Sequence, residues 1–240
     1  MSDLAGRLLA VHARIRAAAL AAGRDPDSVA LVAVSKTFPA ETLLDAVLAG
    51  QHVFGENYLQ EALAKMVDLD RLLALRGAPA APEWHFTGPV QGNKTRAIAR
   101  HFDWVHSVDR LKIAQRLSEA REPGQAPLQV CLQVNVGDET SKGGVNPAQA
   151  EQLARAMAVL PGLRLRGLMT IPRPTDDPAA QRAQFRVLRE LRDRLRTGGL
   201  ALDTLSMGMS DDLESAIAEG ATMVRIGRAI FGERPRAPAQ

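Results

Sequence analysis

VALVAVSK, residues 29–36, joins an unbroken apolar run to a serine and a lysine. Valine-rich runs without polar alternation are typical of parallel strands that are buried on both faces. The next segment, Pro39 to Leu48, begins with proline and is followed by Gly50, which predicts a helix. A buried strand followed at once by a helix is the repeating unit of α/β proteins.

The same alternation continues along the chain. Further strands are predicted at 51–54, 83–87, 103–106, 128–136, 163–168, 203–205 and 223–226. Helices are predicted at 56–76, 93–101, 109–121, from about 147, at 179–196, 211–219 and 228–231. Eight such units predict a single closed (β/α)8 barrel of TIM type, with an open doubly wound sheet as the alternative. We expect the barrel to span 1–232 and residues 233–240 to be a disordered tail.

Composition fits one globular domain, because 46% of the 240 residues are hydrophobic and 24% are charged. Cys131 is the only cysteine, so an intrachain disulfide is excluded and we expect a cytoplasmic protein. Residues 1–16 mix charged and apolar side chains, which favours an amphipathic helix over a signal peptide. No run of apolar residues is long enough to predict a membrane span.

The net charge of +3 does not predict nucleic-acid binding. Basic residues are interleaved with acidic ones, as in 182–196, which is typical of a solvated helix face. Aromatic residues make up only 4% of the chain, so platforms for base stacking are not expected. We expect no metal site.

The segment 128–136 alternates apolar residues with Gln129, Cys131, Gln133 and Asn135. In a barrel the apolar set would face the helices and the polar set the interior. Buried amides need hydrogen-bond partners, so a polar network inside the barrel is expected. The alternative is that Gln129 and Gln133 bond each other or a water molecule.

Lys36 lies where a strand ends, and in parallel barrels the functional face is at this end of the strands. Partial desolvation there favours a neutral, nucleophilic amine, which forms imines with aldehydes. An ion pair with a carboxylate such as Glu56 is the alternative.

Two later strand ends resemble a phosphate site. SMGMS (206–210) and RIGR (225–228) offer hydroxyls and backbone N–H groups in the loops where barrels often bind phosphate. A lysine facing such loops indicates a phosphorylated aldehyde, either pyridoxal 5′-phosphate (PLP) or a sugar phosphate. Arg225 would lie beside the pyridine nitrogen of PLP or pair with Asp211 or Asp212.

Seven stretches in order along the chain resemble the pyridoxal phosphate homeostasis protein family, which is itself similar to the N-terminal barrel of alanine racemase. They are LVAVSKTFP (31–39), FGENYLQEAL (54–63), WHFTGPVQGNKTR (84–96), LQVNVGDETSKGGV (132–145), GLMTIP (167–172), LSMGMSDDLESAI (205–217) and TMVRIGRAIFG (222–232). The resemblance implies a site made of Lys36 as the Schiff-base lysine, Asn57 against the cofactor, Arg225 near the ring nitrogen, and Ser206, Ser210, Gly227 and Arg228 at the phosphate. The family often has a small hydroxyl residue at position 228, so Arg228 is expected to contact phosphate through its backbone.

The resemblance also implies a protein without catalytic turnover, which binds PLP and takes part in PLP, vitamin B6 and amino-acid homeostasis. Apo-enzymes that need PLP would be its recipients, and a monomer is expected. Two other functions stay open, an amino-acid racemase and a Schiff-base aldolase that uses Glu56 and His85. Lys94 and Lys142 are either a second PLP site or surface lysines.

Overall fold

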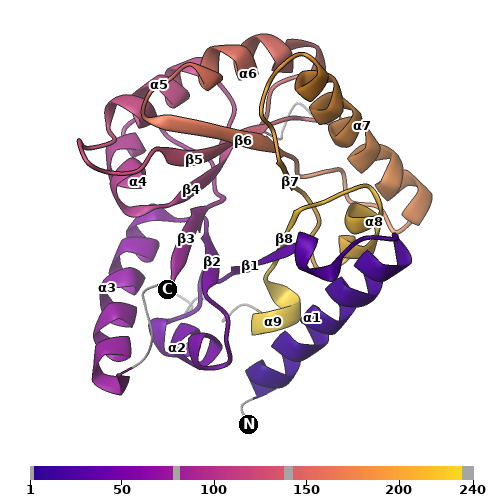
Figure 1. The fold of residues 1–240 in the computed structure, drawn as a ribbon. Helices are drawn as coiled ribbons and strands as arrows, with labels where there is room; N and C mark the ends of the chain where they lie inside the picture. Colours follow the sequence, from indigo (N-terminus) through magenta and orange to yellow (C-terminus); the bar gives the residue numbers. More distant parts are fainter. Residues whose placement is uncertain (1–2, 78–81, 138–142, 234–240) are drawn as a thin grey trace, which may run out of the picture.

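The computed structural model describes residues 3–77, 82–137 and 143–233. Eight parallel strands close into a barrel in chain order (Figure 1), so the closed-barrel prediction is confirmed. The strands are β1 (Ala30–Val34), β2 (Val53–Glu56), β3 (Glu83–Phe86), β4 (Trp104–Val108), β5 (Leu128–Gln133), β6 (Leu163–Met169), β7 (Thr204–Ser206) and β8 (Met223–Ile226).

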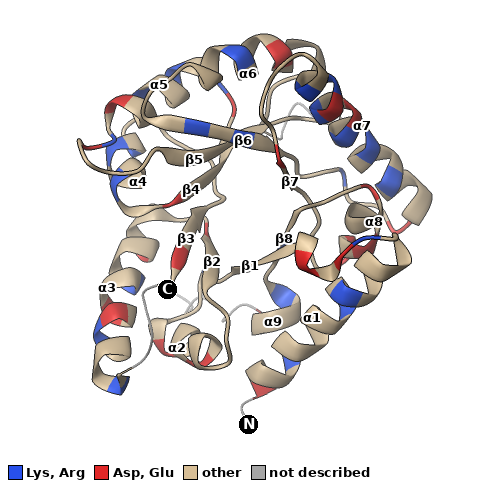
Figure 2. Ribbon diagram, viewed as in Figure 1, with Lys and Arg blue, Asp and Glu red and all other residues tan. Residues whose placement is uncertain are grey.

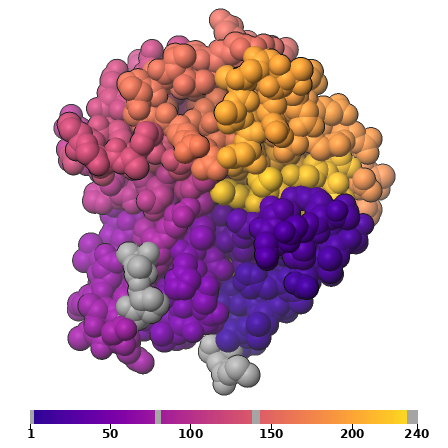
Figure 3. Space-filling model, viewed as in Figure 1, coloured from indigo at the N-terminus to yellow at the C-terminus, as the bar shows by residue number. Residues whose placement is uncertain are grey.

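Helices surround this barrel (Figure 1). They are α1 (Asp3–Ala21), α2 (Ala40–Leu48), α3 (Leu59–Arg76), α4 (Thr95–His101), α5 (Leu111–Glu119), α6 (Ala150–Ala158), α7 (Pro178–Thr197), α8 (Leu213–Ala218) and α9 (Arg228–Phe231). The first helix, α1, precedes the barrel and packs on α8 and α9, so the indigo start of the chain lies against the yellow C-terminal segment in Figure 3. Its buried face carries Leu4, Leu8, Val11 and Ile15 at helical spacing.

Most strand boundaries differ from the sequence prediction by one to three residues, and two of these differences bear on the site. The second strand runs to Glu56, so α3 begins at Leu59 and not at residue 56. The fifth strand stops at Gln133 instead of continuing to residue 136, because the chain leaves the barrel there. Beyond that point Val134 forms only an isolated bridge with Val145.

Apolar side chains form two separate clusters. The large cluster lies between strands and helices and includes Leu128, Val130 and Leu132. Inside the barrel a small cluster contains Trp104, Cys131 and Met169. The predicted alternation of the fifth strand is therefore confirmed for these residues, and most of the barrel interior is left to polar groups.

The two glutamines of this strand do not bond each other. Gln129 accepts a hydrogen bond from Arg166 (2.9 Å) and donates to the carbonyl of Pro127 (3.0 Å). Gln133 donates to the carbonyl of Gly143 (2.8 Å). Each amide thus has partners of its own, at different levels of the barrel.

Charged residues of both signs occur along the outer helices, as the blue and red segments of α7 show in Figure 2. Three arginines of α7, Arg182, Arg186 and Arg189, pair with the buried carboxylate of Glu219. Among the described residues, no helix is both long and apolar enough to cross a membrane.

Candidate functional site

Lys36 and the start of α9 lie at neighbouring strand ends. The first and last strands pair in parallel, with Val32 opposite Arg225. A Cβ at Gly227 would lie 3.1 Å from the carbonyl oxygen of Val34, a tight contact that shows how closely the end of β8 approaches β1. The loop that carries Lys36 therefore adjoins the first turn of α9.

Gly55 on β2 shows which side of β1 faces the barrel interior. A Cβ there would lie 3.0 Å from Val32 and 3.3 Å from Val34, so these valines and Gly55 share one side. Gly55 pairs with His85, which lies inside the barrel. Val34, the last residue of β1, therefore faces the barrel interior. Lys36 is half-buried in the turn after β1.

Asn57 follows β2 at the same edge of the barrel. Its Oδ1 accepts a hydrogen bond from the hydroxyl of Thr87 (2.9 Å). Gly88 packs directly on it, since a Cβ at Gly88 would lie 2.2 Å from the carbonyl oxygen of Asn57. Asn57, the residue predicted to contact the cofactor, is thus held at the mouth of the barrel.

The two predicted phosphate loops meet in the structure. The N–H of Ala229, in the first turn of α9, donates to the hydroxyl oxygen of Ser210 (3.4 Å). Gly208 allows the loop to turn, because its φ is +100° and a Cβ there would lie 2.7 Å from Ala216. Arg228 is exposed and its guanidinium binds Asp211, which ties the two loops together at their outer rim.

Arg225 is buried inside the barrel below these loops. Its Nη1 donates to Ser206 Oγ (2.7 Å) and its Nη2 donates to the carbonyl of Thr170 (2.8 Å). Burial lowers the pKa of Arg225 to about 10, against the opposing effect of the nearby Asp212 carboxylate. The alternative, a direct ion pair between Arg225 and Asp212, is not observed among the described residues. The Asp212 carboxylate instead accepts the N–H of Met209 (2.6 Å).

A chain of hydrogen bonds continues from Ser206 through the barrel to its opposite end. His106 Nδ1 lies 2.7 Å from Ser206 Oγ, and His106 Nε2 lies 2.8 Å from His85 Nδ1. The chain ends where His85 Nε2 meets the carboxylate of Glu83 (2.7 Å), whose side chain is 46% exposed. Burial lowers the pKa of His85 and takes that of His106 well below its ordinary value, so both rings are neutral.

Neutral rings fix the direction of every bond in this chain. The hydrogen bond from His85 lowers the pKa of Glu83, whose carboxylate accepts the Nε2 proton. His85 Nδ1 then accepts from His106 Nε2, and His106 Nδ1 accepts the hydroxyl proton of Ser206. The oxygen of Ser206 can accordingly accept from Arg225. Glu83 at one end of the barrel therefore determines the direction in which the Ser206 hydroxyl donates near the other end.

Glu56 points the other way, toward α3. Its Oε1 accepts hydrogen bonds from Ser35 Oγ (2.7 Å) and Lys65 Nζ (2.6 Å). Burial raises the pKa of this carboxyl. Glu56 and His85 thus lie on opposite sides of neighbouring strands, and the acid–base pair expected for an aldolase is not assembled.

Sequence reasoning missed three residues of this region. No role was assigned from the sequence to His106 or Lys65, and Thr170 was included only in the stretch 167–172. An inward-facing position within a strand was the signal available for His106. Lys94 is half-buried before α4, whereas Lys142 lies outside the described residues.

Comparison with known proteins places this arrangement in a family. The family model described as "Alanine racemase, N-terminal domain" matches residues 7–235. A protein of Pseudomonas aeruginosa named pyridoxal phosphate homeostasis protein is 60% identical over 98% of this chain and 97% of its own. The protein of that name from Escherichia coli K12 is 48% identical over 98% of both chains.

Solved structures agree with this placement. PipY of Synechococcus elongatus, with PLP bound, is 36% identical, with a TM-score of 0.81 over 96% of this chain and 100% of its own. Alanine racemase from Corynebacterium glutamicum has a TM-score of 0.62 at 20% identity and shares the fold over 97% of this chain and 64% of its own.

Proposed function

This chain belongs to the family of pyridoxal phosphate homeostasis proteins, and from that premise we propose that it holds PLP reversibly on Lys36 and helps to balance PLP, vitamin B6 and amino-acid pools. The structure of PipY with PLP bound supports the choice of cofactor. The observation that carries the proposal is the position of Lys36 beside the first turn of α9.

PLP would supply an aldehyde, with which the Lys36 amine forms a Schiff base and releases water. The role of the chain is to present this amine at the interior side of the barrel mouth. Asn57, fixed by Thr87 and Gly88, would bound the cofactor on the side of β2.

The rim of α9 and the 206–210 loop suit the phosphate group. The first N–H groups of a helix have no partner within the helix, so those of Gly227 and Arg228 can donate to an anion. Among the described residues, the Ser210 hydroxyl accepts only a long bond from Ala229, which leaves its O–H proton for a phosphate oxygen. The guanidinium of Arg228 binds Asp211, and its phosphate contact is therefore proposed through the backbone.

Arg225 would face the pyridine nitrogen. A fixed positive charge at this place disfavours protonation of the ring, and an unprotonated ring is a weaker electron sink. Such a ring suits holding the cofactor better than transforming substrates. Two-base racemisation would also need a second base, and the only tyrosine, Tyr58, is 51% exposed at the start of α3.

We propose further that the protein passes PLP to apo-enzymes, acts as a monomer and works in the cytoplasm. The free, buried thiol of Cys131 is compatible with a reducing compartment. Lys94 is proposed to be no part of the PLP site, since it lies before α4 in the segment after β3, which β2 separates from β1.

The test is to add PLP to the purified protein, follow the near-visible absorbance, then reduce with borohydride and map the modified peptide. We expect the band and a label on Lys36, both lost in Lys36→Ala and kept in the control Lys94→Ala. A protein that gains no band refutes the proposal. Inversion of single enantiomers of alanine or serine by the PLP-loaded protein would favour a racemase instead.

A further inference from the structure

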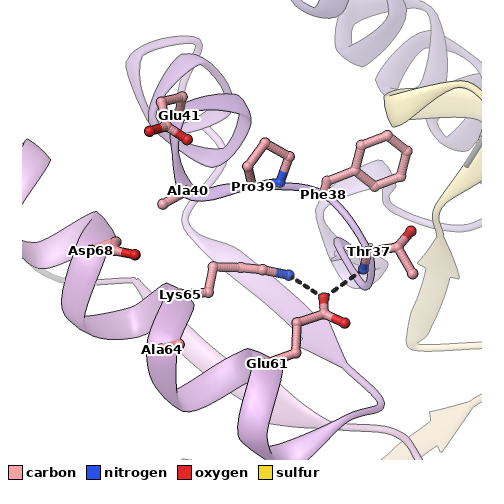
Figure 4. Close-up of a pocket in the computed structure, with 9 residues that line it drawn as sticks. All are labelled: Thr37, Phe38, Pro39, Ala40, Glu41, Glu61, Ala64, Lys65 and Asp68. Carbon is pink, nitrogen blue, oxygen red and sulfur yellow. Dashed lines mark hydrogen bonds and ion pairs between the residues drawn. The ribbon is translucent and has the colours of Figure 1, made fainter. Parts of the chain in front are cut away.

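Both peptide groups that flank Lys36 are held by one cluster of charged residues on α3. Lys65 Nζ donates to the carbonyl oxygen of Ser35 (2.9 Å), the residue before Lys36. The N–H of Thr37, the residue after it, donates to Glu61 Oε1 (2.6 Å). The same carboxylate oxygen accepts from Lys65 (2.9 Å), and Figure 4 shows Glu61 between Lys65 and Thr37.

All three N–H donors of the Lys65 ammonium, at the centre of this cluster, have acceptors within the protein. The side chain of Lys65 is 4% exposed, and its three donors go to Ser35, Glu61 and Glu56. Burying a lysine with two carboxylates gives little net stability, because the cost of desolvation offsets the attraction. A role in fixing geometry explains the cluster better than a contribution to stability does.

The backbone at Thr37 needs such a hold. Its φ of +72° makes it the one non-glycine residue with a left-handed backbone in the part of the chain that the structure describes. This conformation costs a residue with a Cβ about 1–2 kcal/mol. Thr37 Oγ1 is also buried and has no hydrogen-bond partner among the described residues, so the side chain does not offset that cost. The bond to Glu61 opposes the relaxation of this residue to negative φ.

Packing alone does not hold the loop after Lys36 in place. A cavity of about 400 Å³ lies against the loop, lined by Thr37, Phe38, Pro39 and residues of α2 and α3 including Asp68 (Figure 4). Because one side of the loop borders this space, the loop has room to shift if the bonds are lost.

We propose that Glu61 and Lys65 are positioning residues, which hold the Lys36 turn in its left-handed form and so determine how long the protein retains PLP. This inference rests on the proposed attachment of PLP to Lys36. Neither residue touches the cofactor, and both act through the peptide groups on either side of Lys36.

Glu61→Ala is the decisive variant, because its side chain is 33% exposed and its loss leaves Lys65 paired with Glu56. Glu61→Gln keeps an oxygen for the N–H of Thr37 and serves as the conservative rescue. Glu151→Ala is the matched control, since it also removes a carboxylate paired with a basic residue four positions later, Arg155, but on α6.

The first measurement is hydrogen exchange of the Thr37 amide in the PLP-free proteins. We expect faster exchange in Glu61→Ala than in the wild type, Glu61→Gln or Glu151→Ala. The second is the release of PLP from the loaded proteins to an excess of an apo-transaminase. Release should be about tenfold faster in Glu61→Ala, the factor expected for one charge-assisted hydrogen bond, and near the wild-type rate in the other two.

Unchanged release from Glu61→Ala, with faster exchange at Thr37, would overturn the proposal. Unchanged exchange would overturn it as well, because Glu61 would then not hold the turn. If Glu61→Ala does not fold, the same pair of measurements on Lys65→Met decides the matter. Failure of the wild type to load PLP would instead refute the proposed function, and the exchange data would still report on the turn.

Discussion

Replacing Ser206 with alanine tests the hydrogen-bond chain inside the barrel. The change deprives Arg225 Nη1 of its acceptor and His106 Nδ1 of its donor, each at 2.7 Å. Both partners are fully buried, and an unsatisfied buried group costs about 1–3 kcal/mol, more when it is charged. We therefore expect the free energy of unfolding of the PLP-free protein to fall by about 3 kcal/mol.

Urea unfolding at pH 8, followed by circular dichroism, measures this difference. For a chain of this size about 3 kcal/mol corresponds to a fall in Tm of roughly 6–12 °C. Ser210→Ala is the control, because its half-buried hydroxyl accepts only the long bond from Ala229 and should change stability by less than about 0.5 kcal/mol. If Ser206→Ala is no less stable than this control, Ser206 does not link the histidine chain to Arg225.

Two further predictions concern the same interior and the barrel wall. Burial lowers the pKa of His85 and His106, so the unfolded chain binds more protons than the folded one below about pH 6.5. The free energy of unfolding should hence fall on acidification from pH 7, by at most about 1.4 kcal/mol per pH unit for each histidine, and less steeply in His106→Gln. Urea titrations between pH 8 and 5.5 measure this slope, and identical slopes in the two proteins would contradict the assignment. In β6, a Cβ at Gly167 would lie 1.8 Å from the carbonyl oxygen of Thr204, so Gly167→Ala should cost about 3 kcal/mol or more. A Cβ at Gly6 in α1 would have nothing within 4 Å, so Gly6→Ala should instead raise the free energy of unfolding by about 0.5–1 kcal/mol. Equal effects of the two substitutions on the free energy of unfolding in urea would refute the close approach of β6 to β7.

The fold was predictable because its signals are local. Strands buried on both faces are apolar throughout, so runs such as 29–34 stand out without knowledge of their neighbours. The prediction was least accurate where a strand ends in a polar residue. An acidic residue such as Glu56 is typical of the first turn of a helix, yet Glu56 completes β2, where Ser35 and Lys65 donate hydrogen bonds to its Oε1.

The rim of the site was predictable for a topological reason. In a closed parallel barrel every strand ends at the same mouth, so residues after different strands meet whatever the register. This brings the loop of Ser210 to α9, next to the turn of Lys36.

The interior chain and the α3 cluster could not be predicted in this way. The meeting of His85 with His106 depends on the register of β3 and β4, and that of His106 with Ser206 on a contact across the barrel. Likewise, the partners of Lys65 come from β2, α3 and the loop after β1. Such contacts leave no trace in local patterns of hydrophobicity.

The direction of the interior bonds also bears on the predicted phosphate contacts. The hydroxyl proton of Ser206 goes to His106 and its oxygen accepts from Arg225. To donate to a phosphate, Ser206 would have to break its hydrogen bond to His106. The buried ring nitrogen would then lack a donor, at a cost of about 1–3 kcal/mol. Ser210 has no such commitment, because only the 3.4 Å bond from Ala229 involves its hydroxyl. We therefore propose that, of the two predicted phosphate serines, Ser210 donates to the phosphate and Ser206 supports Arg225.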